Sequence, residues 1–168
     1  MKWIGALLII LSCGGFGFYQ AAIYRAEEKN LRDLLRALDL MQCELQYRLT
    51  PLPQLCILVS SQLGGAVGQV FSFFRQELEC QIAPESRSCM RSALLRSKII
   101  TCQTRQLISE LGDTLGQFDL QGQLNGFDAI RMQARSQLAE MSENRGARIR
   151  CYQTMGLCAG AALAILFV

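Results

Sequence analysis

The sequence predicts an all-α protein, a membrane-rooted six-helix bundle with N- and C-terminal transmembrane helices. Two observations carry this prediction. No charged residue occurs from Trp3 to Tyr24 or from Cys151 to Val168, and every charged residue except Lys2 lies between these two runs. In the intervening segment, apolar residues recur every three or four positions, as on one face of a helix, and almost nowhere alternate as in a strand.

The two apolar runs have the lengths of membrane spans. They contain 22 and 18 uncharged residues, and a helix that rises about 1.5 Å per residue needs about 20 residues to cross a hydrocarbon layer of about 30 Å. We therefore expect three parts: an N-terminal transmembrane helix (1–24), a cytoplasmic helical bundle domain (25–150) and a C-terminal transmembrane helix (151–168).

The stretch from Ile10 to Gly15, ILSCGG, resembles a lipoprotein cleavage site at Cys13. However, the apolar run continues through Phe16, Phe18 and Ile23, well beyond the core of a cleaved signal. A retained span is favoured, and an exported, lipid-anchored helical bundle stays open as an alternative.

Basic residues beside the runs predict the orientation, because Lys and Arg resist translocation. Only Lys2 lies outside the two runs, whereas the inner flanks carry Arg25, Lys29, Arg32, Arg36, Arg145, Arg148 and Arg150. The central domain is therefore expected to face the cytoplasm, with both termini outside. The residues expected to flank the membrane directly are Arg25, Arg145, Arg148 and Arg150.

The first helix is expected to run without a break from the membrane to Leu49. Its apolar stripe consists of Leu31, Leu34, Leu35, Leu38, Met41, Leu45 and Leu49. It ends at Thr50-Pro51-Leu52-Pro53, because proline disfavours helical backbone in the residue before it. Thr50 is expected to cap the second helix, with Pro51 at its first position.

Four shorter helices are expected to follow. The second extends to about Leu63 and ends at Gly64-Gly65. The third covers Val67 to Leu78, with a break around Pro84. The fourth spans roughly 85–97 and the fifth 101–115, with Gly116 after its last residue.

The sixth helix is expected to begin at Asp119, a favourable cap residue, and to continue into the second span. No proline interrupts the chain after residue 84. Its apolar stripe comprises Leu120, Leu124, Phe127, Ala134, Leu138 and Met141.

The sequence provides little for catalysis or for binding a cofactor. It has no His, no phosphate-binding loop and no CxxC pair among its eight cysteines, so no catalytic, cofactor or metal site is predicted. In a reducing cytoplasm the cysteines are expected to be free thiols. Residues 25–150 contain 16 basic and 14 acidic side chains in mixed order, which argues against nucleic-acid binding. The chain is not expected to be an enzyme.

Two segments carry a resemblance to a known family. These are LQYRLTPLPQL (45–55) and ELGDTLGQFDLQGQ (110–123), placed between an N-terminal anchor and a long final helix. Their specific parts are the TPLP turn and the pattern formed by Leu115, Gly116, Asp119 and Gln123. On these segments, over nearly its whole length, the chain resembles the stage III sporulation protein AB family, and departs from it in its many cysteines and in Phe118.

The resemblance implies a helical domain similar to the F-type platform domain of type II secretion systems. It also implies a non-enzymatic role in the channel between mother cell and forespore, on the mother-cell side of the outer forespore membrane. The implied partners are the AA-like ATPase of stage III sporulation and the other membrane components of that assembly. The two apolar runs add the lipid bilayer as a partner, and a homo-oligomer stays open.

Six residues in the two main turns are the candidate partner-binding residues: Thr50, Pro51, Leu52, Pro53, Gly116 and Asp119. The favoured alternative is that they are structural corners of the bundle. A competing class of function is a two-span signalling or regulatory protein, in which one long helix slides against the other. The two uninterrupted helices favour that class.

Overall fold

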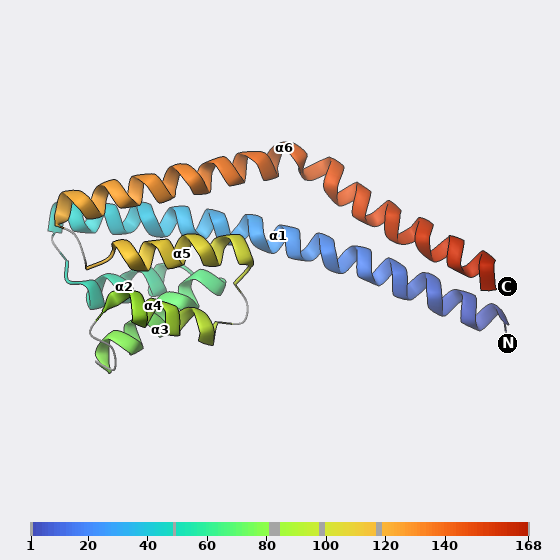
Figure 1. The fold of residues 1–168 in the computed structure, drawn as a ribbon, viewed down its shortest axis with the longest axis horizontal. Coiled ribbons are helices and arrows are strands. Elements are labelled where there is room, and N and C mark those ends of the chain that lie inside the picture. The colour runs from blue at the N-terminus through green and yellow to red at the C-terminus, as the bar shows by residue number, and fades with distance from the viewer. Residues whose placement is uncertain (1, 49, 81–84, 98–99, 117–118, 168) are drawn as a thin grey trace. The chain divides into compact units, whose positions relative to one another are not determined.

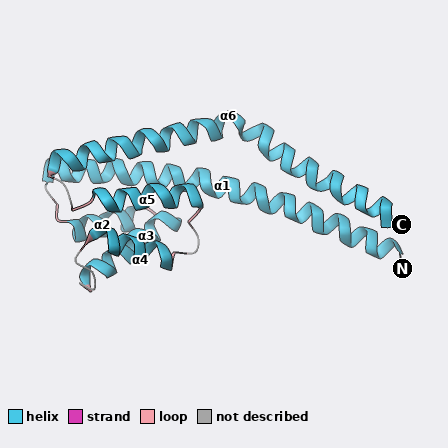
Figure 2. Cartoon of the chain, viewed as in Figure 1, coloured by secondary structure: helices cyan, strands magenta, loops and turns pink. Residues whose placement is uncertain are grey.

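The structure is a computed structural model that describes residues 2–48, 50–80, 85–97, 100–116 and 119–167. Every regular element in this part of the chain is a helix, and there are six of them (Figures 1 and 2). The all-α prediction is confirmed. Within the two long helices, side chains are described at 15, 18–48, 120–143, 151, 154 and 158.

Helix α1 (Lys2–Arg48) is continuous, as the sequence predicts. Four members of its apolar stripe are fully buried, namely Leu31, Leu34, Leu38 and Met41. Leu35 and Leu45 are half-buried, and Leu49 lies outside the described residues. The stripe therefore forms the side of α1 that faces the core.

Helices α2 (Leu52–Gln62) and α3 (Gly65–Glu79) pack closely at a glycine. A Cβ atom on Gly68 would lie 1.8 Å from the carbonyl oxygen of Leu63, at the end of α2. Gly65 starts α3 with a φ of 75°, a left-handed conformation that favours glycine. Gly68 therefore lets α2 and α3 approach closely, because it has no side chain that would separate the two helices, and Gly65 allows the tight turn between them.

Helices α4 (Ser86–Arg96) and α5 (Cys102–Thr114) lie where the fourth and fifth helices are predicted. A second glycine brings them together, because a Cβ on Gly112 would lie 2.6 Å from Cβ of Met90. On the other side of α4, Arg96 donates to Glu77 of α3 at 3.1 Å. The short helices thus pack in chain order, each against the next.

Helix α6 (Leu120–Phe167) is a single helix, and its predicted cap is confirmed. The backbone N–H of Gly122 donates to Oδ1 of Asp119 at 3.0 Å. Phe127 and Ala134 of its stripe are buried. The prediction for Leu120 is wrong: its side chain is 40% exposed, because it is the first residue of the helix, at the end of the bundle.

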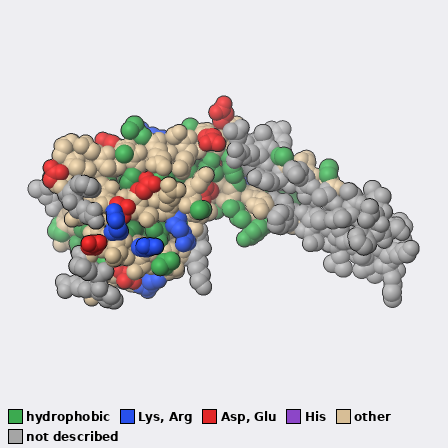
Figure 3. Space-filling model, in the orientation of Figure 1, with side chains coloured by type: hydrophobic (Ala, Val, Ile, Leu, Met, Phe, Trp, Pro, Cys, Tyr) green, Lys and Arg blue, Asp and Glu red, His purple; other side chains and the backbone are tan. Residues whose placement is uncertain are grey.

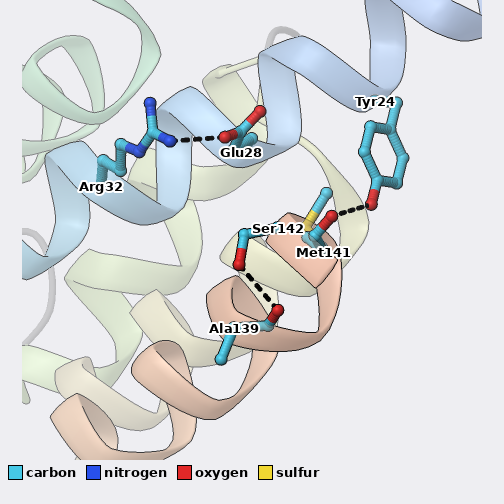
Figure 4. A network of polar contacts seen from close by, with 6 residues as sticks. All are labelled: Tyr24, Glu28, Arg32, Ala139, Met141 and Ser142. Carbon is cyan, nitrogen blue, oxygen red and sulfur yellow. Dashed lines mark hydrogen bonds and ion pairs between the residues drawn. The ribbon is translucent and has the colours of Figure 1, made fainter. Parts of the chain in front are cut away.

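The chain divides into two compact units. One comprises residues 27–138, which include α2 to α5 and the adjoining halves of the long helices. The other comprises residues 1–26 and 139–168. In this second unit the hydroxyl of Tyr24 donates to the carbonyl oxygen of Met141 at 2.7 Å (Figure 4), so the two long helices are in contact there.

Among the described residues, no helix combines the length and the apolar content that crossing a membrane requires. Most side chains of the two predicted spans, 1–24 and 151–168, lie outside the described residues.

Candidate protein interface

The first predicted partner-binding turn joins α1 to α2. The expectation that Thr50 caps α2 is wrong: the cap position is Pro51, whose carbonyl accepts the N–H of Leu55 at 3.0 Å. The hydroxyl of Thr50 instead donates to Oε2 of Glu44 in α1 at 2.9 Å. The reason is that two prolines follow, and Pro51 itself has extended backbone with a ψ of 145°. Pro51 and Pro53 are exposed.

The second predicted turn joins α5 to α6. Gly116 has a φ of 77°, and a Cβ there would lie 2.7 Å from Oγ of Ser86 in α4. Both facts require glycine. Asp119 is exposed and uses one carboxylate oxygen to cap α6. Phe118, the residue that departs from the family pattern, lies outside the described residues.

These two turns lie at the same end of the 27–138 unit. Arg131 of α6 contacts Asp39 and Gln42 of α1, and Figure 1 shows the two helices running in opposite directions there. Counting from these contacts at about 1.5 Å per residue, the end of α1 and the start of α6 lie within about one helical turn of each other. Figure 1 shows both at the end of this unit where the two turns occur.

Two exposed apolar side chains lie beside the turns. The sequence did not lead us to expect either of them at the surface. Tyr47, in the last turn of α1, is 77% exposed, and Leu120 is 40% exposed. Tyr47 could have been found, because it lies off the apolar stripe of α1. We define the corner surface as Tyr47, Pro51, Pro53 and Leu120. Aromatic side chains such as that of Tyr47 are enriched at protein contact surfaces.

The predicted membrane-flanking residues are described only in part. Arg25 is exposed on α1, whereas the side chains of Arg145, Arg148 and Arg150 lie outside the described residues. Farther along α1, Arg32 pairs with Glu28, whose side chain is 3% exposed (Figure 4). Acidic and basic side chains are interspersed on the described face of the protein (Figure 3), in agreement with the mixed order of charges in the sequence.

The described residues include no cluster of three or more His, Cys, Asp or Glu side chains able to hold a metal ion. Burial raises the pKa of Cys56 to about 12, although the positive charge of Arg75 partly opposes this shift. Its thiol is therefore protonated at neutral pH and is not a nucleophile. An open cleft of about 410 Å³ lies between α2 and α3. It is lined by Ser60, Ser61, Gln69 and Arg75, among others.

The comparisons with known proteins agree on one family. A model of the stage III sporulation protein AB family matches residues 2–168. Stage III sporulation protein AB of Bacillus subtilis (strain 168) is 22% identical over 171 residues, which cover 100% of this chain and 99% of that protein. A solved structure of a stage III sporulation protein AB is similar with a TM-score of 0.64 at 19% identity, over 73% of this chain and 98% of that one. The chain belongs to the stage III sporulation protein AB family.

Proposed function

We propose that this protein is a non-enzymatic membrane platform of the stage III sporulation assembly, and that it binds a partner ATPase and other membrane subunits. The observation that carries the proposal is the corner surface. Two turns from distant parts of the chain meet at one end of the 27–138 unit, and both present exposed apolar side chains, Tyr47 and Leu120. Family membership supports the sporulation context.

In this proposal, residues 1–24 and 151–168 cross the membrane and residues 25–150 form the cytoplasmic domain. Arg25, Arg145, Arg148 and Arg150 would then lie at the anionic headgroups. The absence of charged residues from both terminal runs supports this arrangement. In a sporulating cell the domain would face the mother cell from the outer forespore membrane. Reporter fusions after residue 60 and at both termini test it, and periplasmic-type activity from the internal fusion would contradict it.

The partner is proposed to be an AA-like ATPase of the same organism, bound at the corner surface. Asp119 and Thr50 are each engaged within the chain, so their role is to shape the turns. The direct contacts would come from Tyr47, Pro51, Pro53 and Leu120. Since aromatic side chains often dominate binding energy, we expect Tyr47 to contribute most.

Titration of the full-length protein in detergent with the purified ATPase tests this assignment. The double variant Tyr47→Ser/Leu120→Gln should weaken binding about tenfold or more, because it removes two apolar contacts. Leu95→Gln is the matched control, since Leu95 is 72% exposed on α4, outside the corner surface. The control should bind as the unchanged protein does. Equal affinity of the double variant, or a loss confined to the control, would exclude the corner surface.

The uninterrupted course of α1 and α6 favours a second function, that of a two-span signalling or regulatory protein. In such a protein, axial sliding of one helix against the other would carry the signal. Crosslinking of cysteines introduced at positions 24 and 141 with a bifunctional maleimide, which spans the distance bridged by the long Tyr24 side chain, separates the functions. A crosslinked protein that still supports assembly would favour the platform, and loss of function on crosslinking would favour sliding.

A further inference from the structure

The start of α5 is capped by a different helix. The N–H of Thr104 donates to Oε1 of Glu27 at 3.0 Å, and the Thr104 hydroxyl donates to the same oxygen at 3.1 Å. Thr101, at the cap position of α5, makes no capping bond with its own side chain. Its hydroxyl instead accepts from Nδ2 of Asn30 at 3.2 Å. Glu27 and Asn30 of α1 therefore take over a task that a helix usually performs with its own residues.

The Glu27 carboxylate is buried, which makes this contact sensitive to position. Glu27 is 7% exposed and Thr104 is fully buried. No ion pair of Glu27 occurs among the described residues, so its charge is balanced by two hydrogen bonds and by the positive end of the α5 dipole. A buried carboxylate that loses such partners is costly, because water cannot replace them.

Asp33 extends the same arrangement to α3. Its side chain is 7% exposed, and Oδ2 lies 3.9 Å from the position that a Cβ of Gly65 would occupy. Glu27, Asn30 and Asp33 are spaced by three residues on α1 and form what we call the polar row. Two of its members are acidic, and they face the starts of α5 and α3, where helix dipoles favour negative charge.

The neighbours of Glu27 on α1 cannot replace its carboxylate. The residues one helical turn away are Ile23 and Tyr24 on one side and Asn30 and Leu31 on the other. An axial shift of α1 by one turn, about 5.4 Å, would therefore leave the N–H of Thr104 facing a neutral or apolar side chain. The contact therefore favours one register of α1 against α5, since none of these neighbours offers a charged acceptor.

We propose that Glu27 and Thr104 form a coupling contact through which axial displacement of α1 loosens the first turn of α5. Glu27 and α5 belong to the same unit, 27–138, so a displacement of this part of α1 acts directly on the contact. The coupling contact requires neither a particular partner nor a membrane location. This contact connects α1 mechanically to α5.

Hydrogen exchange of the full-length protein, followed by mass spectrometry, tests the coupling. Glu27→Gln keeps the shape of the side chain and removes its charge. It should speed exchange in residues 101–107 about tenfold or more, while α2 and α3 exchange as before. Glu143→Gln, an exposed position on α6, is the matched control and should change nothing.

Coupling also requires the reverse effect, because an interaction free energy is reciprocal. Thr104→Val should speed exchange of α1 around residue 27, and Thr104→Ser, which keeps the hydroxyl, should restore the original rate. A simple cap would loosen α5 alone, so an unchanged α1 in Thr104→Val would overturn the proposal. Uniformly faster exchange throughout residues 27–138 in Glu27→Gln would do the same.

If Glu27→Gln does not fold, Asn30→Ala provides the same test with a milder change. It removes a neutral contact to Thr101, so exchange in residues 101–107 should rise about threefold to tenfold. No increase in that segment would also overturn the proposal.

Discussion

Arg131 of α6 lies 2.7 Å from Asp39 of α1 and joins the two long helices across the surface of the bundle. Its side chain is 16% exposed and also pairs with Asp128 at 2.9 Å. Both acidic partners are more than half exposed, so water competes for them. The buried Nε of Arg131 has no hydrogen-bond partner among the described residues, which further limits the gain from this cluster.

Replacing Arg131 should therefore destabilise the protein only moderately. We expect Arg131→Met to lower the free energy of unfolding by about 1–2 kcal/mol, since the aliphatic part is kept and hydrated carboxylates remain. Arg135→Met, at an exposed position on the same helix, should change it by less than about 0.5 kcal/mol. Urea unfolding of the full chain in detergent measures both. Equal effects would show that Arg131 has no special role.

Gly68 should tolerate no side chain. In an ordinary helix Gly→Ala stabilises by about 1 kcal/mol, but here the added Cβ would lie 1.8 Å from the Leu63 carbonyl. We expect Gly68→Ala to destabilise by about 2–3 kcal/mol or more, because α2 and α3 must separate. Gly64→Ala is the control: its φ is −79° and no atom lies within 4 Å of an added Cβ. The same unfolding assay should show a smaller loss for Gly64→Ala, of at most about 1 kcal/mol, because Gly64 is the cap residue of α3 and Ala is a poorer cap than Gly.

Asp119 should act through its cap and not through its charge. Asp119→Ala removes the acceptor of the Gly122 N–H and should cost about 1 kcal/mol of stability. Asp119→Asn keeps a capping oxygen and should cost a few tenths of a kcal/mol. Thermal unfolding and titration with the ATPase, run on both variants, separate stability from binding. Weak ATPase binding by a stable Asp119→Asn protein would show that the carboxylate itself contacts the partner.

Cys56 should resist alkylation, because its thiol is buried. At pH 8.5 the exposed Cys43 should react with iodoacetamide much faster than the buried Cys56, as peptide mass spectrometry can measure.

The stability of the protein should also fall at alkaline pH because of Cys56. The pKa of its thiol in the folded state, about 12, exceeds the ordinary value of 9.0. The unfolded thiol therefore loses its proton first, and the stability contributed by a neutral Cys56 is present below pH 9 and lost between about pH 9 and 12. A Cys56→Ala variant should lack this part of the alkaline loss.

Three of the helix boundaries were predictable because they have a local cause. Pro51 and Pro53 end α1, the Gly64-Gly65 pair ends α2, and Gly116 follows α5. Asp119 can be recognised in the sequence as the cap residue of α6, because it lies three residues before the Gly122 N–H that it binds. Such signals act over a few residues and need no tertiary information.

What the sequence could not provide are contacts between distant residues. Thr50 has the chemistry of a helix cap, yet its hydroxyl binds Glu44 because Pro51 takes the cap position. Glu27 resembles a surface residue of a charged helix, and only the packing of α5 shows it to be buried. The one available signal was the spacing of Glu27, Asn30 and Asp33, three polar residues that lie beside the apolar stripe.

The cap of α5 also has a consequence for synthesis on the ribosome. Glu27 leaves the exit tunnel 77 residues ahead of Thr104. Until Thr104 has emerged, the Glu27 carboxylate stays hydrated, and no contact with α5 fixes the axial position of α1. Because α2, α3 and α4 contact their sequence neighbours, they can associate early, whereas the junction of α1 with α5 must form late. The nascent chain therefore docks its first helix against the fifth only after most of the domain has been made.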